Sequence, residues 1–333
     1  MRGQTWTTPM EARPASFDLV PLPQMHIVTP CVLSRSLSDH VGRPVYLKLE
    51  NLQPSGSFKI RGIGHAMRKA AKAGVKSFVV SSGGNAGLAA AHAARELGLP
   101  ITVFLPTSTH GLVAKKLEAE GAHVQIHGRI WNEAAEKAQS TAEETGAFLV
   151  HPFDHPDVWK GHSSVIDELK DQLGEEPGLI VTCVGGGGLL LGIIEGLERV
   201  GWSRVPILCM ETEGADCFNA SVKAGHLVSI PDITSIAKCL GARKPAGALE
   251  KHLGKKEIIS RVVSDKQALT AILRFADEHR MLVEPACGAA LAGLYEEASK
   301  VALSDGKPIV VVLCGGSAVS LQLLQEWRSI VSQ

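Results

Sequence analysis

The sequence predicts an α/β protein whose mainly parallel sheets are flanked by helices. Short apolar segments alternate with longer helical ones along nearly the whole chain, a pattern typical of βα units. Most glycine clusters stand just after a strand-like segment, where such folds bind ligands. The expected strands are Val45–Leu49, Phe78–Ser81, Ile101–Leu105, His123–Ile126, Ala147–Val150, Leu179–Val184, Pro206–Met210 and Pro308–Leu313. The expected helices are Ser57–Gly74, Gly84–Leu97, Leu112–Glu120, Trp131–Thr145, Val158–Leu173, Leu189–Val200 and Val319–Val331.

Size and charge limit the classes of function. The chain has 333 residues, 45% of them hydrophobic, which is enough for a core divided between two lobes. Lysine and arginine total 34, as do aspartate and glutamate, so no general attraction to nucleic acid or anionic membranes is expected. No apolar run reaches the length of a membrane span, and residues 1–16 lack a secretory pattern. A soluble, cytoplasmic protein is expected.

The number and spacing of the cysteines agree with a cytoplasmic location. The count is odd and no two cysteines form a C-x-x-C pair. Reduced thiols are therefore expected, with neither a disulfide framework nor a zinc site. The seven are Cys31, Cys183, Cys209, Cys217, Cys239, Cys287 and Cys314.

A lysine opens one of the predicted helices. The segment Pro54–Gly62 reads PSGSFKIRG, and its serines and glycine are typical of a helix start. Lys59 falls in the first turn, where the helix dipole disfavours a cation and lowers the pKa of an amine. Such an amine suits imine formation. Taken alone, however, the pattern fits a surface lysine at a helix start better.

Two further clusters follow strands. Ser81–Gly87 reads SSGGNAG; its amides and hydroxyls suit a carboxylate at a helix N-terminus, although an ordinary turn with an asparagine cap explains it equally well. Cys314–Ser317 reads CGGS, and a thiol at a strand end could face a ring nitrogen. The usual fate of a free cysteine is that of a small buried hydrophobe.

Four glycines in a row form the most informative cluster. Gly185–Leu189 (GGGGL) lies between a predicted strand and a predicted helix. Consecutive glycines let backbone N–H groups curl around a phosphate at the helix N-terminus, whereas a structural loop rarely needs four of them. The pattern is neither a nucleotide P-loop nor the spaced dinucleotide motif. Phosphate binding is the favoured interpretation.

Taken together, these clusters carry a resemblance. The chain resembles the fold-type II enzymes that use pyridoxal 5'-phosphate (PLP), which share a tryptophan synthase β-like fold. Within them it is similar to the mammalian-type L-serine dehydratase/L-threonine deaminase branch, which includes the serine dehydratase-like proteins. The resemblance covers nearly all of Thr29–Leu324. The segments that carry it are Gln53–Gly62 (QPSGSFKIRG), Ser81–Gly87, Gly185–Leu189, Met210–Ala215 (METEGA), Val283–Ala290 (VEPACGAA) and Cys314–Ser317.

The resemblance implies a role for each candidate residue. Lys59 would form the Schiff base with PLP and later handle the Cα proton, with Phe58 against one face of the ring. Asn85 would bind the ring hydroxyl and Cys314 the ring nitrogen. The substrate carboxylate would be held by Ser82, Gly83, Gly84 and Asn85, and the cofactor phosphate by Gly185, Gly186, Gly187, Gly188 and Leu189.

The same resemblance implies the reaction. A thiol is a weak donor that cannot keep the ring nitrogen fully protonated, so the cofactor is a weaker electron sink and β-elimination is favoured over transamination. The implied reactions convert L-serine to pyruvate and ammonia, and L-threonine to 2-oxobutanoate and ammonia. They belong to amino-acid catabolism and gluconeogenesis.

A cation, the lobes and the assembly are further implications. Glu211 with backbone oxygens of Ala215, Leu240 and Ala242 would bind potassium, although Cys217 departs from relatives and a structural role for Glu211 is almost as strong. Cys239 would cover the second ring face. Residues 1–61 with 153–333 would form a large PLP-binding lobe and residues 62–152 a small one. A homodimer is expected.

Other functions remain open at this stage. The nearest is serine racemase, which needs acid–base groups on both faces of the substrate; the racemases that the chain resembles place a serine where this chain has Gly83. A cysteine synthase usually has Asp-Arg after the lysine, unlike Ile60 and Arg61. A dinucleotide-binding protein built on Gly185–Gly188 is an alternative from another class, and it would lack the violet absorbance of PLP.

Overall fold

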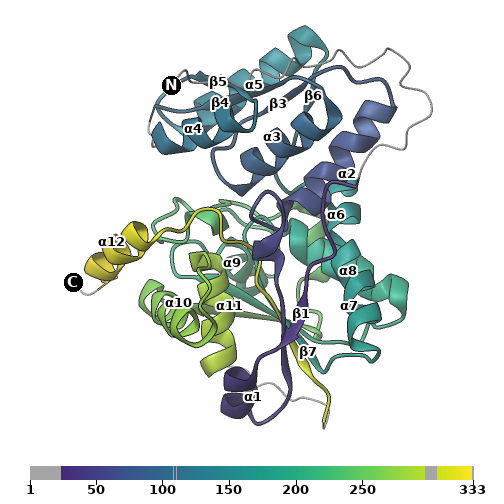
Figure 1. Cartoon of the computed structure of the whole chain (residues 1–333), viewed down its shortest axis with the longest axis vertical. Coiled ribbons are helices and arrows are strands. Elements are labelled where there is room, and N and C mark those ends of the chain that lie inside the picture. Colours follow the sequence, from purple (N-terminus) through teal and green to yellow (C-terminus); the bar gives the residue numbers. More distant parts are fainter. Residues whose placement is uncertain (1–23, 108, 110, 297–305, 332–333) are drawn as a thin grey trace, which may run out of the picture.

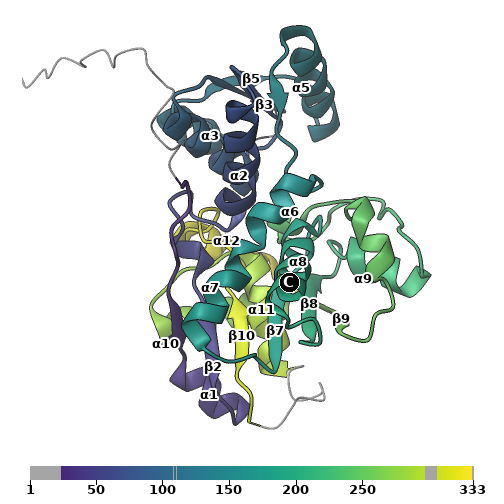
Figure 2. The same ribbon diagram turned by 90° about the vertical axis from the view of Figure 1, so that its right-hand side faces the viewer.

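Two sheets organise the computed structural model, which describes residues 24–107, 109, 111–296 and 306–331. The six-stranded sheet runs, in spatial order, β1 (Cys31–Leu33), β2 (Val45–Lys48), β10 (Ile309–Val312), β7 (Leu179–Cys183), β8 (Ile207–Thr212) and β9 (Ile258–Val263). The four-stranded sheet runs β5 (His123–Ile126), β4 (Ile101–Leu105), β3 (Phe78–Val80) and β6 (Phe148–Leu149). Figures 1 and 2 show them in separate halves of the molecule.

Helices separate most of the strands along the chain. They are α1 (Arg35–Val41), α2 (Lys59–Lys72), α3 (Asn85–Leu97), α4 (Gly111–Ala119), α5 (Trp131–Thr145), α6 (Pro156–His162), α7 (Ser164–Leu173), α8 (Gly188–Val200), α9 (Cys217–Ala224), α10 (Asp265–His279), α11 (Pro285–Glu296) and α12 (Leu321–Val331). Short 3-10 helices are η1 (Glu50–Leu52), η2 (Lys238–Leu240) and η3 (Gly247–His252). Among the residues described, no helix is both long and apolar enough to cross a membrane.

The predicted α/β class with mainly parallel sheets is confirmed. Among the residues described, every strand pair is parallel except β1 with β2. The central strands β7 and β10 are buried at every position, as expected for strands covered on both faces. The antiparallel β1 is an edge strand.

The small sheet is built from one continuous stretch of chain. Its four strands lie between residues 78 and 149, whereas the strands of the large sheet come from both sides of that stretch. Helix α2 packs against α3 of the upper half and α6 of the lower half (Figure 1). The lobe boundaries expected at residues 62 and 152 stay predictions, because sheet membership does not fix where one lobe passes into the other.

One predicted helix is two helices in the structure. The stretch 158–173 was expected to be continuous, but α6 ends at His162 and α7 begins at Ser164. Hydroxyl groups at the junction bind helix carbonyls, Ser163 that of Lys160 and Ser164 that of Gly161. Such bonds compete with the regular backbone ladder. The expectations also omitted β1, β9, α1, α9, α10 and α11.

A buried cluster of four charged side chains anchors the start of α2. Arg61 donates to Glu50 through Nε and Nη2, both at 2.7 Å, and to Glu168 through Nη1 at 2.6 Å. Lys48 also donates to Glu168. The two positive and two negative groups balance, which is the condition for burying charges without a large penalty. Because Arg61 is two residues from Lys59, this cluster fixes the helix turn that carries the lysine.

Candidate active site

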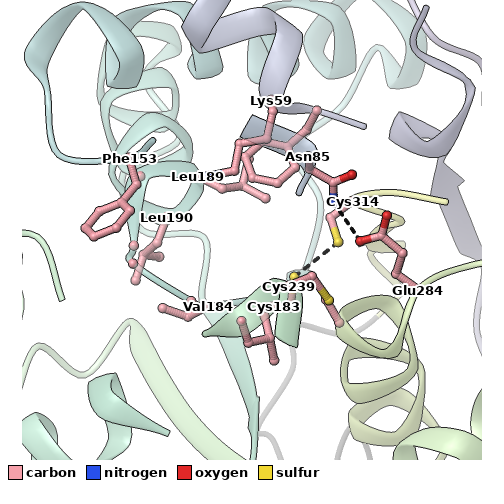
Figure 3. A pocket seen from close by; sticks show the side chains of 17 residues that line it. Lys59, Asn85, Phe153, Cys183, Val184, Leu189, Leu190, Cys239, Glu284 and Cys314 are labelled. Carbon is pink, nitrogen blue, oxygen red and sulfur yellow. Dashed lines mark hydrogen bonds between the residues drawn. The ribbon is translucent and has the colours of Figure 1, made fainter. Parts of the chain in front are cut away.

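A pocket gathers most of the residues predicted to form a site. Lys59 begins α2, Asn85 begins α3, the glycines link β7 to α8, and Cys314 follows β10. Figure 3 shows the side chains of Lys59, Asn85 and Cys314 around one cavity. The lining comprises Phe58, Lys59, Asn85, Phe153, Cys183, Val184, Gly185, Gly186, Gly187, Gly188, Leu189, Leu190, Cys239, Leu240, Glu284, Ala286 and Cys314.

Lys59 lies in this pocket, and the pKa of its side-chain amine is lowered. Its Nζ donates to the carbonyl oxygen of Pro152 at 2.6 Å. Burial lowers the pKa of the lysine from 10.5 to about 8, although Cys314 and other nearby acidic groups act in the opposite direction. The interpretation of Lys59 as a surface lysine is therefore wrong. A neutral amine is accessible near physiological pH, as nucleophilic and base chemistry requires.

The four glycines form a tight turn into α8. Gly187 is the N-cap of the helix and has a φ of 88°, in the left-handed region that favours glycine. A Cβ there would lie 2.2 Å from Cδ1 of Leu249. At Gly186 a Cβ would lie 2.3 Å from the ring of Phe153. Side chains are thus excluded from this turn, which leaves backbone N–H groups and the helix N-terminus to face an anion.

The segment before α3 leaves a helix N-terminus without a side-chain cap. The N-cap residue is Gly84, and no side chain caps the first turn. The orphan amides of such a turn favour an anionic group. Asn85 extends from this turn into the pocket, where its Nδ2 donates to Oε2 of Glu284 at 2.7 Å (Figure 3). Its Oδ1 accepts a hydrogen bond from Ser317.

Three thiols meet beside the cavity, and two of them, those of Cys183 and Cys314, line it. The Sγ of Cys314 lies 3.4 Å from that of Cys183 and 3.4 Å from that of Cys287. Hydrogen bonds with these two thiols, together with burial, raise the pKa of Cys314 well above its usual value. Cys314 therefore presents a neutral S–H group. All seven cysteines are free in the structure, and their redox state in the cell stays a prediction.

Comparison with known proteins identifies the family. A family model described as pyridoxal-phosphate dependent enzyme matches residues 22–315. The chain belongs to this family. It is 50% identical to a serine dehydratase-like protein of Mus musculus, over 91% of this chain and 94% of the relative. It is 47% identical to an L-serine dehydratase/L-threonine deaminase of Homo sapiens, over 90% of this chain and 94% of the relative.

A solved structure gives the same result for the fold. The crystal structure of a fungal L-serine ammonia-lyase from Rhizomucor miehei superposes with a TM-score of 0.85 at 36% sequence identity. The match covers 92% of this chain and 98% of the fungal one. The fold-type II assignment made from the sequence is confirmed.

The residues in the pocket fit PLP. The cofactor has an aldehyde for an amine, and Lys59 supplies an amine with a lowered pKa. It has a phosphate, and the turn at Gly186 and Gly187 is one that a Cβ would obstruct. Its ring carries a hydroxyl and a nitrogen, and the pocket offers the polar groups of Asn85 and Cys314. Binding of a dinucleotide would not require a buried lysine with a lowered pKa. The pocket therefore does not support the dinucleotide-binding alternative.

Some predicted residues lie away from the pocket lining. Ser82, Gly83 and Gly84 precede α3 but are not among the lining residues, and neither are Glu211, Ala215 and Ala242. Cys239 and Leu240 do line it. The two carboxylate oxygens of Glu211 accept from the backbone amides of Phe218 at 2.9 Å and Asn219 at 2.7 Å. These contacts stabilise the first turn of α9, which is the structural role left open by the sequence.

The sequence interpretation missed several residues of the site. Glu284, Cys183 and Phe153 line the pocket, yet none was assigned a role. Glu284 stands in the segment VEPACGAA, where an acidic residue directly before a helix-starting proline was an available signal. No local pattern marks Phe153. His162 is buried against Phe58, with a ring-centroid distance of 4.8 Å, and neither of its ring nitrogens has a hydrogen-bond partner.

Proposed function

We propose that this protein is a PLP-dependent L-serine/L-threonine ammonia-lyase. It converts L-serine to pyruvate and ammonia, and L-threonine to 2-oxobutanoate and ammonia. The observation that carries the proposal is one pocket containing Lys59, the glycine turn and a neutral thiol at Cys314. The names of the mouse, human and fungal relatives support the substrate class.

Each candidate residue has a defined task in this proposal. When bound, PLP supplies a carbonyl that condenses with amines and an electron sink that acidifies the Cα hydrogen of the amino acid. Lys59 holds the cofactor and takes the Cα proton, and Phe58 packs against one ring face. Asn85 and Cys314 bind the ring hydroxyl and nitrogen. The phosphate is held by Gly185, Gly186, Gly187, Gly188 and Leu189, and the substrate carboxylate by Ser82, Gly83, Gly84 and Asn85.

The thiol at Cys314 supports elimination over transamination. A neutral S–H group is a weak donor and provides no negative charge to keep a ring nitrogen protonated. The substrate must then relieve the developing negative charge by another route. Expulsion of the β-hydroxyl does so, and the atoms of L-serine are fully accounted for by pyruvate and ammonia.

Serine racemase is the second candidate, and the structure bears on it through Gly83. A racemase needs a second proton donor opposite Lys59, and Gly83 has no side chain to serve. A Cβ at Gly83 would lie 2.9 Å from Cγ1 of Val113 and 3.2 Å from Cδ2 of Leu105. The position is packed against neighbouring side chains, which supports the lyase over the racemase.

A monovalent cation completes the proposed site. We infer that potassium binds beside the cofactor, held by Glu211 and by backbone oxygens of Ala215, Leu240 and Ala242. Burial raises the pKa of Glu211 well above its usual value, so a nearby cation would stabilise the ionised carboxylate. Leu240 belongs to the pocket lining, which supports a cation site near the proposed cofactor.

The cellular setting is proposed by analogy with the family resemblance. We infer a cytoplasmic homodimer that acts in amino-acid catabolism and supplies 2-oxo acids to gluconeogenesis. Residues 1–61 with 153–333 form its large PLP-binding lobe, and residues 62–152 its small lobe. The four-stranded sheet, contained within residues 78–149, supports that division.

A product assay tests the function. Purified protein loaded with PLP is incubated with L-serine, L-threonine and their D-isomers, and 2-oxo acid, ammonia and D-serine are measured. The proposal expects equal amounts of 2-oxo acid and ammonia from the L-isomers, and no turnover by Lys59→Ala. D-serine formed as fast as pyruvate would favour the racemase instead.

A further inference from the structure

A buried carboxylate in the pocket has no role in the proposed reaction. Glu284 precedes α11, is fully buried, and lines the pocket together with Lys59 and Cys314. Among the residues described, no Lys, Arg or His forms a salt bridge with it. An isolated buried charge is costly unless hydrogen bonds satisfy it, so the partners of Glu284 decide what it does.

Hydrogen-bond donors from three segments converge on this carboxylate. Oε1 accepts the backbone N–H of Ala318 at 3.0 Å, and Oε2 accepts Nδ2 of Asn85 at 2.7 Å. The thiol of Cys239 is a further hydrogen-bond partner. Burial raises the pKa of Glu284, and these bonds oppose that shift. A group surrounded by donors acts as an acceptor, which is the role of an ionised carboxylate.

The carboxylate also determines which way the Asn85 amide faces. An ionised carboxylate only accepts, so the amide nitrogen must face Glu284 and the amide oxygen must face the opposite way. The hydroxyl of Ser317 donates to that oxygen. A flipped amide would place two acceptors 2.7 Å apart. Glu284 therefore selects one of the two amide orientations, and the Ser317 hydroxyl, which also lies 3.4 Å from Oε1 of Glu284, can donate or accept and adapts to it.

This orientation leaves one amide hydrogen for the pocket. The Nδ2 atom of Asn85 carries two hydrogens, and Glu284 takes one. Within the described part of the chain, the second has no protein partner among the contacts of Asn85. Because Asn85 lines the pocket, it presents a donor there, while its acceptor oxygen is already occupied. A donor stabilises an oxygen that bears negative charge over one that carries a proton.

We propose that Glu284 is a positioning residue that fixes Asn85 as a hydrogen-bond donor, so that the site selects the ionised form of the cofactor's ring hydroxyl. The inference rests on the proposed contact between Asn85 and that hydroxyl. It does not require any particular substrate. The same contact joins the start of α3, which follows strand β3 of the small sheet, to the residue just before α11, beside the large sheet.

The test measures cofactor binding, without substrate, in three variants and one control. Glu284→Gln replaces one carboxylate oxygen, which accepts hydrogen bonds, by an amide NH2 group, which is itself a donor and cannot accept them. PLP affinity is measured by titrating the apoprotein, and the ionisation of the bound cofactor by the ratio of violet to near-ultraviolet absorbance. Glu284→Gln is expected to weaken PLP binding about 10- to 100-fold, as for the loss of a hydrogen bond to a charged group, and to lower the violet fraction. Glu213→Gln, an exposed carboxylate on the same lobe, should change neither.

A double variant separates positioning from mere support of the fold. Combining Asn85→Asp with Glu284→Gln restores an amide-to-carboxylate hydrogen bond with its direction reversed, but removes the free N–H from the pocket. Thermal unfolding should return toward that of the wild type, whereas PLP affinity and the violet fraction should stay low. If the unfolding temperature, the PLP affinity and the violet fraction all recovered, Glu284 would have only a structural role and the proposal would be overturned.

A milder variant covers the case in which Glu284→Gln does not fold. Ser317→Ala removes the donor to the Asn85 amide oxygen and should weaken PLP binding several-fold, with a smaller fall in the violet fraction. The proposal is overturned if the folded variants bind PLP within threefold of the wild type with unchanged spectra. Since these measurements use no substrate, a protein that binds PLP normally yet lacks lyase activity would contradict the proposed function alone.

Discussion

The amine of Lys59 is bound to the carbonyl oxygen of Pro152, at a distance of 2.6 Å. Lys59 begins α2, whereas Pro152 follows β6 at the other end of the stretch that forms the small sheet. The hydrogen bond therefore links residues more than 90 positions apart in the chain and ties the lysine to the end of the small-sheet stretch.

The first prediction concerns the pH at which apoprotein captures PLP. Only the neutral amine attacks a carbonyl, and burial lowers the pKa of Lys59 to about 8. The capture rate should therefore rise with pH around a midpoint near 8, well below the 10.5 of an ordinary lysine. Rapid-mixing absorbance measures it, and borohydride should fix the cofactor on the Lys59 peptide. Lys69→Met, at an exposed site on the same helix, is the control. A midpoint near 10, or an adduct on another lysine, contradicts the assignment.

The second prediction tests the glycine turn with two matched substitutions. Gly187 and Gly201 flank α8 with φ values of 88° and 83°, so an alanine at either site costs about 1–2 kcal/mol of stability. At Gly187 the new Cβ also meets Leu249, whereas nothing lies within 4 Å at Gly201. Gly187→Ala should weaken PLP affinity at least about tenfold, and Gly201→Ala should leave it unchanged. Equal affinities would count against a phosphate site in this turn.

The third prediction concerns conversion to a racemase. Gly83→Ser supplies a hydroxyl, but its Cβ would crowd Val113, Leu105 and Thr109. Overpacking of this kind costs about 1–3 kcal/mol, so the single variant should unfold at a lower temperature and form little D-serine. Adding Val113→Ala should restore stability. Chiral analysis of the products, with Val113→Ala alone as the control, measures the effect. A racemase created by Gly83→Ser at full stability would show that this packing is irrelevant.

The fourth prediction tests the proposed cation. Potassium should raise the thermal unfolding temperature relative to tetramethylammonium at equal ionic strength, because a bound cation stabilises the buried carboxylate of Glu211. Glu211→Gln should abolish the difference, and Glu213→Gln should retain it. If Glu211 serves only to hold the amides of Phe218 and Asn219, Glu211→Gln will lose stability equally in both salts.

Local patterns predicted much of the fold because the residues that indicate each helix or strand lie within a short stretch of the chain. The apolar runs of β7 and β10 indicate strands buried on both faces, and both are buried at every position. Four consecutive glycines indicate a turn without room for side chains, and steric contacts at Gly186 and Gly187 agree. The helix prediction failed where side-chain hydrogen bonds interrupt a helical pattern. The break between α6 and α7 depends on side-chain hydroxyls that bind helix carbonyls.

The sequence by itself determined the α/β alternation, the family and the positions of Lys59, Asn85, Gly185–Gly188 and Cys314. Each of those signals is a short, continuous segment of the chain. The tertiary structure decided the environment of each group. Burial, rather than the helix dipole alone, sets the lowered pKa of Lys59. The contact between Asn85 and Glu284 joins residues 199 positions apart. Desolvation and hydrogen bonding depend on neighbours distant in sequence, so no local pattern could have specified them.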